Sequence, residues 1–296
     1  MPRHGLRSGR LASVALVLVM AVCLPPVTAL AAELKIATWN LDWLTDRPAN
    51  DPALPSDVHV RGAGDFDRLR YYAAQLNADV IAIQEVDGSA VAARLFPASQ
   101  YSIHMTHDDV VQRVGIVVRR GLAYAVNPDV TALDVDPRSH LRSGADITLH
   151  LGGESLRILA LHLKTGCHDA SLTKHTRRSC AELRAQIRPL QEWIGARRRE
   201  GVPFLVLGDF NRHMDGKDQL WSALRRVAPL VRATEGHTSP CWGGESFIDH
   251  IIAGGQARDW MQVSTLKVLT YLESGEVWKD RLSDHCPVSI MLQVAE

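Results

Sequence analysis

The stretch Leu-Gly-Asp-Phe-Asn at residues 207–211 directly follows the apolar run of residues 202–206. A short apolar run of this kind is typical of a buried strand. Two side chains that offer oxygen ligands, Asp209 and Asn211, therefore follow the end of a buried strand. Carboxylate and amide oxygens are the ligands that suit Mg²⁺, Mn²⁺ and Ca²⁺. The stretch predicts a metal-dependent site at one edge of a sheet.

Five further short motifs with polar or titratable side chains lie at or beside other apolar runs. Each motif alone is explained equally well by a turn or a helix cap. Together they are hard to explain in this way, because oxygen-rich side chains are costly to bury without a cation. The motifs are Thr38-Trp39-Asn40, Gln84-Glu85, His162, Ile248-Asp249-His250 and Ser283-Asp284-His285.

The rest of the chain mixes predicted strands with helices. Helical spacing of apolar residues is present at 65–76 and at 179–199, where Pro189 should kink or split the longer helix. Gly152-Gly153 predicts a hairpin turn, and the segment 46–64, rich in Pro, Asp and Gly, predicts a surface loop. This order favours two packed sheets flanked by helices. The predicted strands are residues 34–38, 80–83, 114–118, 147–151, 156–161, 204–207, 247–252, 263–268 and 287–292.

Residues 1–31 have the pattern of a secretory signal. They contain three arginines, an apolar stretch at 11–24 and the small-x-small sequence Ala29-Leu30-Ala31. A retained signal anchor is the alternative, but the apolar stretch is shorter than the roughly 20 residues of a membrane span. We therefore expect a secreted or periplasmic protein whose residues 32–296 form one domain, without stable membrane association.

The charge balance argues against a general affinity for polyanions. The chain has 33 basic and 33 acidic residues, and removal of residues 1–31 leaves a formal net charge of −3. Affinity for nucleic acid that does not depend on sequence comes from Lys and Arg at the phosphates. Binding of nucleic acid would therefore require a local basic patch.

Four cysteines remain after residue 31, and they allow three pairings. Export to an oxidising compartment favours disulfides. We expect Cys167 to pair with Cys180 and Cys241 with Cys286. Free or zinc-binding thiols are the alternative, but the sequence contains no Cys-x-x-Cys spacing.

The polar motifs supply the groups that phosphodiester hydrolysis requires, which are a cation site, a base and a donor for the leaving oxygen. Hard oxygen ligands come from Asn40, Glu85, Asp209, Asn211 and Asp284. They point to Mg²⁺, with Mn²⁺ or Ca²⁺ as alternatives.

Two histidines are candidates for proton transfer. His285 is predicted to activate water, with Asp249 fixing its tautomer and orientation. His162, at the end of another predicted strand, could protonate the leaving oxygen or hold a phosphate oxygen. We expect Trp39 and Trp43 to pack in the core or beside the site, whereas Trp242 could either cover the core or stack on a base.

The six motifs, in this order and at these intervals, resemble the endonuclease/exonuclease/phosphatase superfamily, which includes the pancreatic deoxyribonucleases and the abasic-site repair endonucleases. The resemblance extends over nearly all of residues 33–296. It implies an α+β fold, a four-layer α/β/β/α sandwich with two packed, mainly antiparallel sheets, and a site at one edge of the sheets.

The resemblance also implies a role for each motif. Glu85 is the expected principal metal ligand, with Asn40 and Asp284 nearby. Asp209 and Asn211 are expected to position the nucleophile and the phosphate. Asp249 and His285 complete the centre, and His162 resembles the deoxyribonuclease branch, since the abasic-site branch has a tyrosine in the comparable region.

Further basic residues are candidates for phosphate binding. Arg142 lies where members of this superfamily often carry an arginine that contacts a phosphate. Lys174, Arg177 and Arg178, together with His175, lie in or beside the predicted Cys167–Cys180 loop. They could border the cleft and hold a polyanion, or form a solvated loop.

The sequence therefore predicts a secreted, monomeric nuclease that hydrolyses DNA, and RNA as a further substrate, by metal-assisted attack of water. Both internal and terminal cleavage are consistent with these residues. The alternative is a phosphodiesterase or phosphatase acting on phospholipid headgroups or small phosphoesters, although the Trp-Cys-Asp-Arg motif of the inositol-lipid phosphatases is absent. A non-catalytic binding module should lack a metal ligand or a catalytic histidine, and none is missing.

Overall fold

The computed structural model describes residues 1–2, 5, 32–174 and 177–294. The predicted signal at 1–31 therefore lies almost wholly outside the described residues. The helices are α1 Ala63–Leu76, α2 Ser89–Ala92, α3 Arg178–Glu200, α4 Gln219–Arg225, α5 Ala257–Trp260 and α6 Glu276–Arg281, with 3₁₀ turns η1 Thr131–Leu133, η2 Pro137–Ser139 and η3 Cys241–Gly243. The strands are β1 Ala32–Leu44, β2 Val80–Val86, β3 Tyr101–Met105, β4 Arg113–Arg119, β5 Ala123–Val126, β6 Ala145–Leu151, β7 Glu154–His162, β8 Phe204–Asp209, β9 Leu230–Arg232, β10 Thr238–Ser239, β11 Glu245–Ser246, β12 Asp249–Gly254, β13 Met261–Val268 and β14 Val288–Val294.

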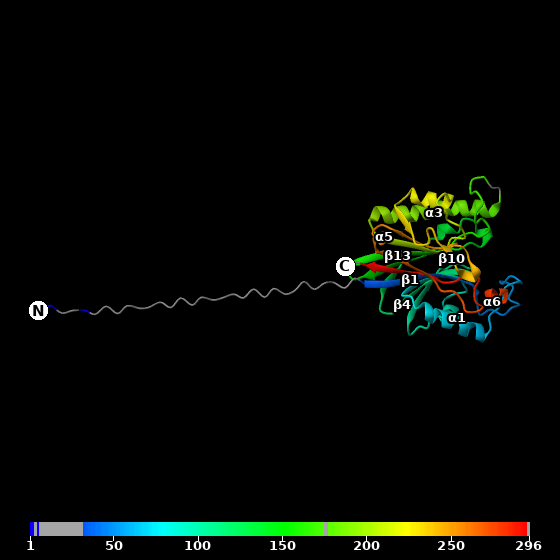
Figure 1. Ribbon diagram of the computed structural model, residues 1–296, viewed down its shortest axis with the longest axis horizontal. Coiled ribbons are helices and arrows are strands. Elements are labelled where there is room, and N and C mark those ends of the chain that lie inside the picture. Colours follow the sequence, from blue (N-terminus) through cyan, green and yellow to red (C-terminus); the bar gives the residue numbers. More distant parts are fainter. Residues whose placement is uncertain (3–4, 6–31, 175–176, 295–296) are drawn as a thin grey trace.

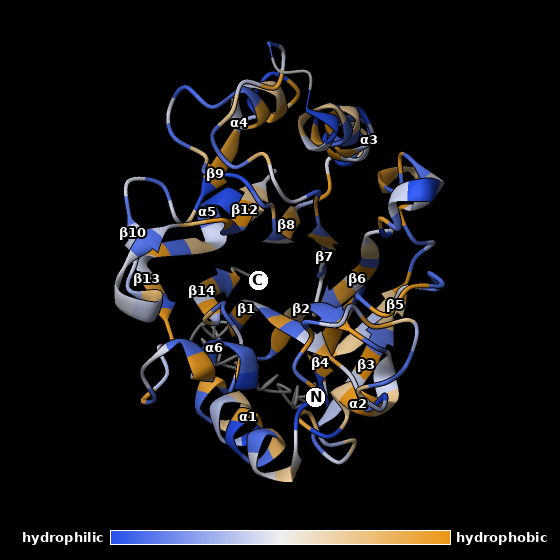
Figure 2. Cartoon of the chain, turned by 90° about the vertical axis from the view of Figure 1, so that its right-hand side faces the viewer, coloured by the Kyte–Doolittle hydropathy of each residue, from blue (hydrophilic) through white to orange (hydrophobic). Residues whose placement is uncertain are grey.

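Two six-stranded sheets form the centre of the domain. Their strand orders are β13-β14-β1-β2-β4-β3 and β5-β6-β7-β8-β12-β9. In the first sheet β1 runs parallel to β2, in the second β7 runs parallel to β8, and the other pairs within the sheets are antiparallel. The helices α3 and α4 lie outside one sheet and α1 lies outside the other (Figures 1 and 2). The predicted four-layer α/β/β/α sandwich is confirmed.

Strand residues alternate between two cores, as expected for side chains with a period of two. Between the sheets, Ile36 and Val80 of the first sheet pack in one cluster with Leu205 of the second. Their neighbours point outward, so that Ile81 packs against α1 and Val206 packs against α3. The apolar runs on these strands are continuous because both faces of the strands are buried.

The two parallel pairs bring polar residues to one edge of the molecule. Asn40 of β1 is level with Gln84 of β2, and His162 of β7 is level with Asp209 of β8. The antiparallel strand β12 begins at the same edge, with Asp249 opposite Asp209. Figure 2 looks onto this edge, where the strands of both sheets end between the outer helices.

Several predicted elements differ from the structure. The helix α3 is continuous through Pro189, so of the predicted kink or split the split is wrong, and the kink stays a prediction. Leu183 and Leu190, on both sides of the proline, pack in the same cluster. The strand predicted at 247–252 runs instead from Asp249 to Gly254. A Cβ added at Gly254 would lie 2.0 Å from the ring of Phe204, so only glycine fits at this position.

Both predicted disulfides are present. Cys167 is bonded to Cys180 and Cys241 to Cys286. The first joins the segment after β7 to the beginning of α3, and the second joins η3 to the residue that follows His285. In the described part of the chain, no helix is long and apolar enough to cross a membrane.

Candidate active site

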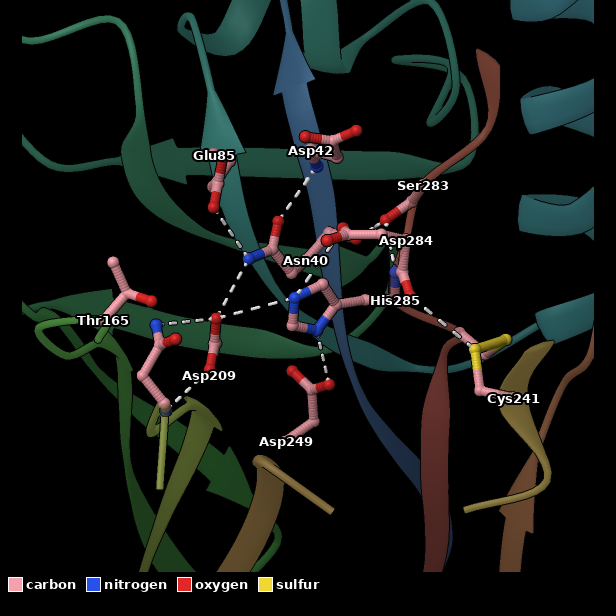
Figure 3. Close-up of polar contacts among 12 residues, drawn as sticks. Asn40, Asp42, Glu85, Thr165, Asp209, Cys241, Asp249, Ser283, Asp284 and His285 are labelled. Atoms are coloured by element: carbon pink, nitrogen blue, oxygen red, sulfur yellow. Dashed lines mark hydrogen bonds and ion pairs between the residues drawn. A yellow bond between two sulfur atoms is a disulfide. The ribbon is translucent and has the colours of Figure 1, made fainter. Parts of the chain in front are cut away.

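The site is assembled from both sheets and centres on the carboxylate of Asp209. Its Oδ2 accepts hydrogen bonds from Asn40 Nδ2 at 3.1 Å and from Asn211 Nδ2 at 3.0 Å. It also lies 3.4 Å from His162 Nε2 and 3.8 Å from His285 Nε2. The first sheet and the segment before β14 supply Asn40 and His285, and the second sheet supplies Asp209 (Figure 3). The second sheet also supplies His162, at the end of β7.

The backbone of the Gly-Asp-Phe-Asn stretch explains why these residue types occur there. Gly208 has φ +143°, and a Cβ at this position would lie 2.0 Å from the carbonyl oxygen of Leu161. Asn211 follows with φ +50°, a conformation that asparagine tolerates better than most residues. Its backbone N–H donates to Asp209 Oδ1 at 2.7 Å and its side chain donates to Leu163 O at 3.1 Å. The carboxylate of Asp209 is thereby fixed in the cleft.

Glu85 occupies a second position on the floor of the cleft. Its backbone has φ +60°, which is unusual for a glutamate and is typical of strained functional positions. Oε1 accepts from Asn40 Nδ2 at 3.0 Å, and Oε2 accepts from Gln112 Nε2. Oε1 also lies 3.7 Å from His162 Nε2. Glu85, His162 and Asp209 form a group whose ligand atoms all lie within 4.8 Å of one another.

Asn40 enters this group through its amide nitrogen. Nδ2 donates to both Glu85 and Asp209, whereas Oδ1 accepts from the backbone N–H of Asp42 at 2.9 Å. In this arrangement Asn40 is a donor that holds the two carboxylates in place (Figure 3). Its role as a metal ligand stays a prediction.

His285 and Asp249 form the predicted imidazole and carboxylate pair. His285 Nδ1 donates to Asp249 Oδ2 at 2.7 Å, which leaves Nε2 directed at Asp209. Burial alone would lower the pKa of His285, but the carboxylate of Asp249 overrides burial and holds this pKa well above its usual value. Asp209 and Asp284 contribute to the same rise.

His162 has a pKa that is shifted in the opposite direction from that of His285. Its side chain is 4% exposed, and burial followed by repulsion from Arg142 holds its pKa well below the usual value. Its Nδ1 is buried without a hydrogen-bond partner among the described residues. The pKa values of the two histidines on either side of Asp209 are therefore shifted in opposite directions.

Burial and crowding act on the carboxylates as well. Burial raises the pKa of Asp209 to about 7, although His285 opposes the rise. Burial, followed by repulsion from Asp284, raises the pKa of Asp42 to about 7. The side chain of Asp284 is 58% exposed at the mouth of the site and lies 3.8 Å from His285 Nε2. Carboxylates crowded in this way favour a bound cation, which removes their mutual repulsion.

A cleft of about 490 Å³ lies above these groups. Its lining includes Glu85, Arg142, His162, Asp209, Asn211 and Asp284 with His285, so the structure gathers these predicted residues around one space. Arg142 is buried and donates through Nε and Nη2 to Gln112 O and Oε1, both at 3.2 Å. Burial lowers its pKa, and the charges of Glu85 and Asp209 oppose this change.

The predicted basic cluster is not part of this lining. Within the described residues, Lys174 and Arg177 do not line the cleft, and His175 lies outside those residues. Arg178 is bound to Glu182 at 2.7 Å and to Asp136 at 3.1 Å, and it lines an adjoining cavity. From this region, Lys164, which follows β7, lines the cleft instead, as does His168.

Several residues of the site were missed by sequence reasoning. Asp42 and Trp43 follow the Trp39-Asn40 motif, and both have positive φ, +44° and +53°. Trp43 was expected to pack in the core or beside the site, but it lines the cleft, whereas Trp39 is fully buried. Gln112 carries no sequence signal, because it precedes β4 in an irregular segment.

A buried chain of hydrogen bonds supports His285 from behind. Tyr271 OH donates to His285 O at 2.7 Å and accepts from Trp39 Nε1 at 3.0 Å. Ser283 Oγ donates to Asn40 O at 2.8 Å and accepts from His285 N at 3.0 Å. These contacts join the segment before β14 to β1.

The sequence matches the model of the Endonuclease/Exonuclease/phosphatase family over residues 37–285. No curated protein matches it. Among solved structures, TDP2 from Caenorhabditis elegans is 16% identical, with a TM-score of 0.59 and coverage of 88% of this chain and 75% of that one. The 3′ phosphatase NExo from Neisseria, bound to a product DNA hairpin, is 16% identical, with a TM-score of 0.56 and coverage of 87% and 98%.

A structure of D. rerio TDP2 complexed with single strand DNA product is 14% identical, has a TM-score of 0.56 and covers 88% of this chain and 98% of that one. At these identities the likeness concerns the fold. The family match extends over most of the chain and includes the motifs from Trp39-Asn40 to Asp284-His285. The chain belongs to the endonuclease/exonuclease/phosphatase family, whose members are hydrolases of the phosphodiesterase and phosphatase type.

Proposed function

We propose that this protein is an exported, divalent-cation-dependent nuclease that hydrolyses DNA, and RNA as a further substrate. One observation carries the proposal: Asp209 Oδ2 lies 3.4 Å from His162 Nε2 and 3.8 Å from His285 Nε2, and His285 is paired with Asp249. An imidazole oriented by a carboxylate is suited to take a proton from water, and a second imidazole on the other side of Asp209 is suited to contact the phosphate. Family membership supports the same reaction class.

The side chains on the floor of the cleft fit a divalent cation. Glu85, Asp284 and Asn40 are the residues that would hold it, with Asp42 beside them. Hard oxygen ligands favour Mg²⁺, with Mn²⁺ and Ca²⁺ as alternatives. Bound there, the cation would supply positive charge to a phosphate oxygen.

The protein's own residues would then divide the reaction between them. His285, oriented by Asp249, takes a proton from the attacking water, and Asp209 with Asn211 positions the water and the phosphate. Asp209 and Asp284 raise the pKa of His285, so neutralising them with a cation favours the neutral imidazole that a base requires.

The leaving side of the phosphate faces His162 and Arg142. His162, whose pKa is held well below its usual value by burial, is placed to donate a hydrogen bond from Nε2 to the leaving oxygen or to another phosphate oxygen. The guanidinium of Arg142, buried in the cleft lining, is placed to bind a phosphate oxygen.

The preference for a nucleic-acid substrate rests on solved structures that this chain resembles. The likeness to D. rerio TDP2 and to NExo, both solved with DNA products, supports a DNA substrate. The two disulfides support export to an oxidising compartment. We further propose that the protein acts as a monomer without stable membrane association.

The test incubates the purified protein with a linear DNA oligonucleotide, a linear RNA and a choline phosphodiester, with Mg²⁺, with Mn²⁺ and with excess chelator. We expect chelator-sensitive hydrolysis of DNA, abolished in Asp209→Ala and His285→Ala variants that keep the wild-type circular dichroism spectrum. His237→Ala, at an exposed histidine outside the cleft lining, is the matched control. Turnover of the choline ester without turnover of either nucleic acid would move the protein to the phospholipid alternative.

A further inference from the structure

The lining of the cleft changes in charge from one side of β1 to the other. Trp43 at the end of β1 lines the cleft and also a second cavity of about 500 Å³, which shares Asp42 and Asp284 with the cleft. This second space lies on the β14 side of β1, because Asp284 precedes β14. We call it the acidic cavity, after its carboxylates Asp42, Asp57, Glu245, Glu276, Asp280 and Asp284.

Basic side chains in the acidic cavity do not balance these carboxylates. Lys279 is paired with Glu276 at 3.0 Å, and His59 lies 3.6 Å from Asp65 outside the cavity. Asp42 and Asp284 lie beside the proposed cation, but Asp57, Glu245 and Asp280 have no basic partner among the described residues of the cavity lining. A phosphate that entered would still meet an excess of negative charge, and juxtaposing like charges costs enough to exclude a partner. The next phosphate of a nucleic-acid strand is therefore repelled from this side.

The opposite side of the cleft has the reverse character. A cavity of about 290 Å³, the basic cavity, shares Ser139 and Lys164 with the cleft and is lined by Arg138 and Arg178. Glu182 is the one carboxylate in its lining. Arg138 and Arg178 are paired with Asp136, and Arg178 and Lys164 with Glu182, so this region keeps only a small excess of positive charge. Arg142 in the cleft adds to the local positive charge that phosphate binding requires.

Two tryptophans form walls of the acidic cavity. Trp43 and Trp242 both have left-handed backbones, with φ +53° and +48°, which is costly for a bulky side chain and is typical of functional positions. Trp242 is held by a hydrogen bond from Nε1 to Ser283 O at 3.0 Å and packs against Tyr271 with ring centroids 5.1 Å apart. Partly exposed indoles offer a face on which a base can stack, whatever its sequence.

We infer that the acidic cavity receives the terminal nucleoside of a strand, stacked on Trp43 or Trp242, and excludes any nucleotide beyond it, so that the enzyme removes residues from strand ends rather than cutting within strands. The inference rests on the proposed nuclease function. Water adds to phosphorus, one P–O ester bond breaks, and the leaving oxygen takes a proton. Whichever ester bond breaks, the terminal nucleoside in the acidic cavity is attached to the scissile phosphate and carries no other phosphate.

The experiment compares one single-stranded DNA sequence as a linear oligonucleotide and as a covalently closed circle, at fixed Mg²⁺ and ionic strength. We expect the linear form to shorten from one end and the circle to react at least about tenfold more slowly, since its next phosphate must enter the acidic cavity. An additional phosphate on the 5′ or on the 3′ terminal nucleoside should slow the reaction at the end that the cavity receives.

A charge-neutralising variant tests the cause. Glu276→Gln with Asp280→Asn removes two exposed carboxylates from the cavity and leaves the cleft unchanged. We expect cleavage of the circle to rise several-fold while cleavage of the linear form stays within about twofold. The matched control is Asp259→Asn with Glu235→Gln, an equal change of charge at exposed positions outside both cavities.

The outcomes separate the two ideas. A circle that is cut as fast as the linear strand overturns the inference and leaves the nuclease function standing. An equal effect of the cavity pair and the control pair on the circle also overturns it. If the protein splits the choline ester in a chelator-sensitive way but hydrolyses no DNA, the proposed function falls and the inference falls with it.

Discussion

The imidazole Nδ1 of His285 donates a hydrogen bond of 2.7 Å to Oδ2 of Asp249. Because this contact fixes both the tautomer and the direction of Nε2, the pair should act as one unit. We expect Asp249→Asn and His285→Ala each to lower kcat by about 10²- to 10⁴-fold. The double variant should be little worse than the poorer single variant, and steady-state kinetics on linear DNA checks this. Fully additive losses would contradict the coupling.

Gly208 is the position in the Gly-Asp-Phe-Asn stretch that tolerates no side chain. A Cβ there would lie 2.0 Å from Leu161 O, so the two parallel strands β7 and β8 would have to separate. We expect Gly208→Ala to lower the free energy of unfolding by more than about 1 kcal/mol and to reduce activity by displacing Asp209. Urea unfolding measures the first effect. Gly216→Ala, where nothing lies within 4 Å of the added atom, is the control and should be nearly neutral.

Tyr271 is a positioning residue that acts through His285. Removing its hydroxyl leaves the buried Nε1 of Trp39 without its acceptor and His285 O without its donor. We expect Tyr271→Phe to reduce stability by about 1–3 kcal/mol and to lower kcat more than it changes KM. A variant that loses stability but keeps the wild-type kcat would show that the tyrosine serves only the fold.

His250 should make the fold sensitive to acid. It is buried between Thr234 Oγ1 at 2.6 Å and Arg212 O at 3.0 Å, and burial lowers its pKa to about 3. The unfolded chain, with an ordinary histidine pKa near 6.5, binds the proton first. Stability is therefore complete above about pH 6.5 and falls as the pH drops towards 3.

We expect His250→Asn to be less stable than the wild type at pH 7.5 but to lose less stability between pH 6.5 and 4.5. Chemical denaturation at both values measures the difference. The exposed His237→Asn variant should keep the wild-type dependence on pH. A His250→Asn variant with the unchanged slope would contradict the assignment.

The two disulfides should differ in what they stabilise. Cys241–Cys286 closes 45 residues and Cys167–Cys180 closes 13, so the chain-entropy model gives the longer loop an advantage of about 1 kcal/mol. Cys286 also follows His285 directly. We expect replacement of Cys241 and Cys286 by alanines to reduce both Tm and kcat more than replacement of Cys167 and Cys180. Calorimetry and kinetics on the two double variants decide the order.

Much of the fold was predictable because buried strands leave apolar runs, and the strand ends that carry Glu85, His162 and Asp209 could be located from these runs. Short strands such as β3 and β5 left no such signal. Their stability comes from pairing with a neighbouring strand rather than from their own composition.

The site was predictable in membership but not in orientation. Sequence could place Asn40 in the centre, but only the structure shows that its amide nitrogen rather than its oxygen faces the carboxylates. It could not place Trp43 in the cleft either, because that placement depends on a left-handed backbone at a residue type that rarely adopts one.

Each sheet supplies part of the reaction centre, so the distances between the catalytic groups depend on how the two sheets are aligned with each other. A packing change between Ile36 and Leu205, far from the cleft, would shift Glu85 and Asn40 against Asp209 by whatever distance one sheet slips along the other. A misplacement of about 1 Å at the reacting groups can lower the rate about 10²-fold. In this protein, we therefore expect core substitutions between the two sheets to lower kcat more than they lower Tm.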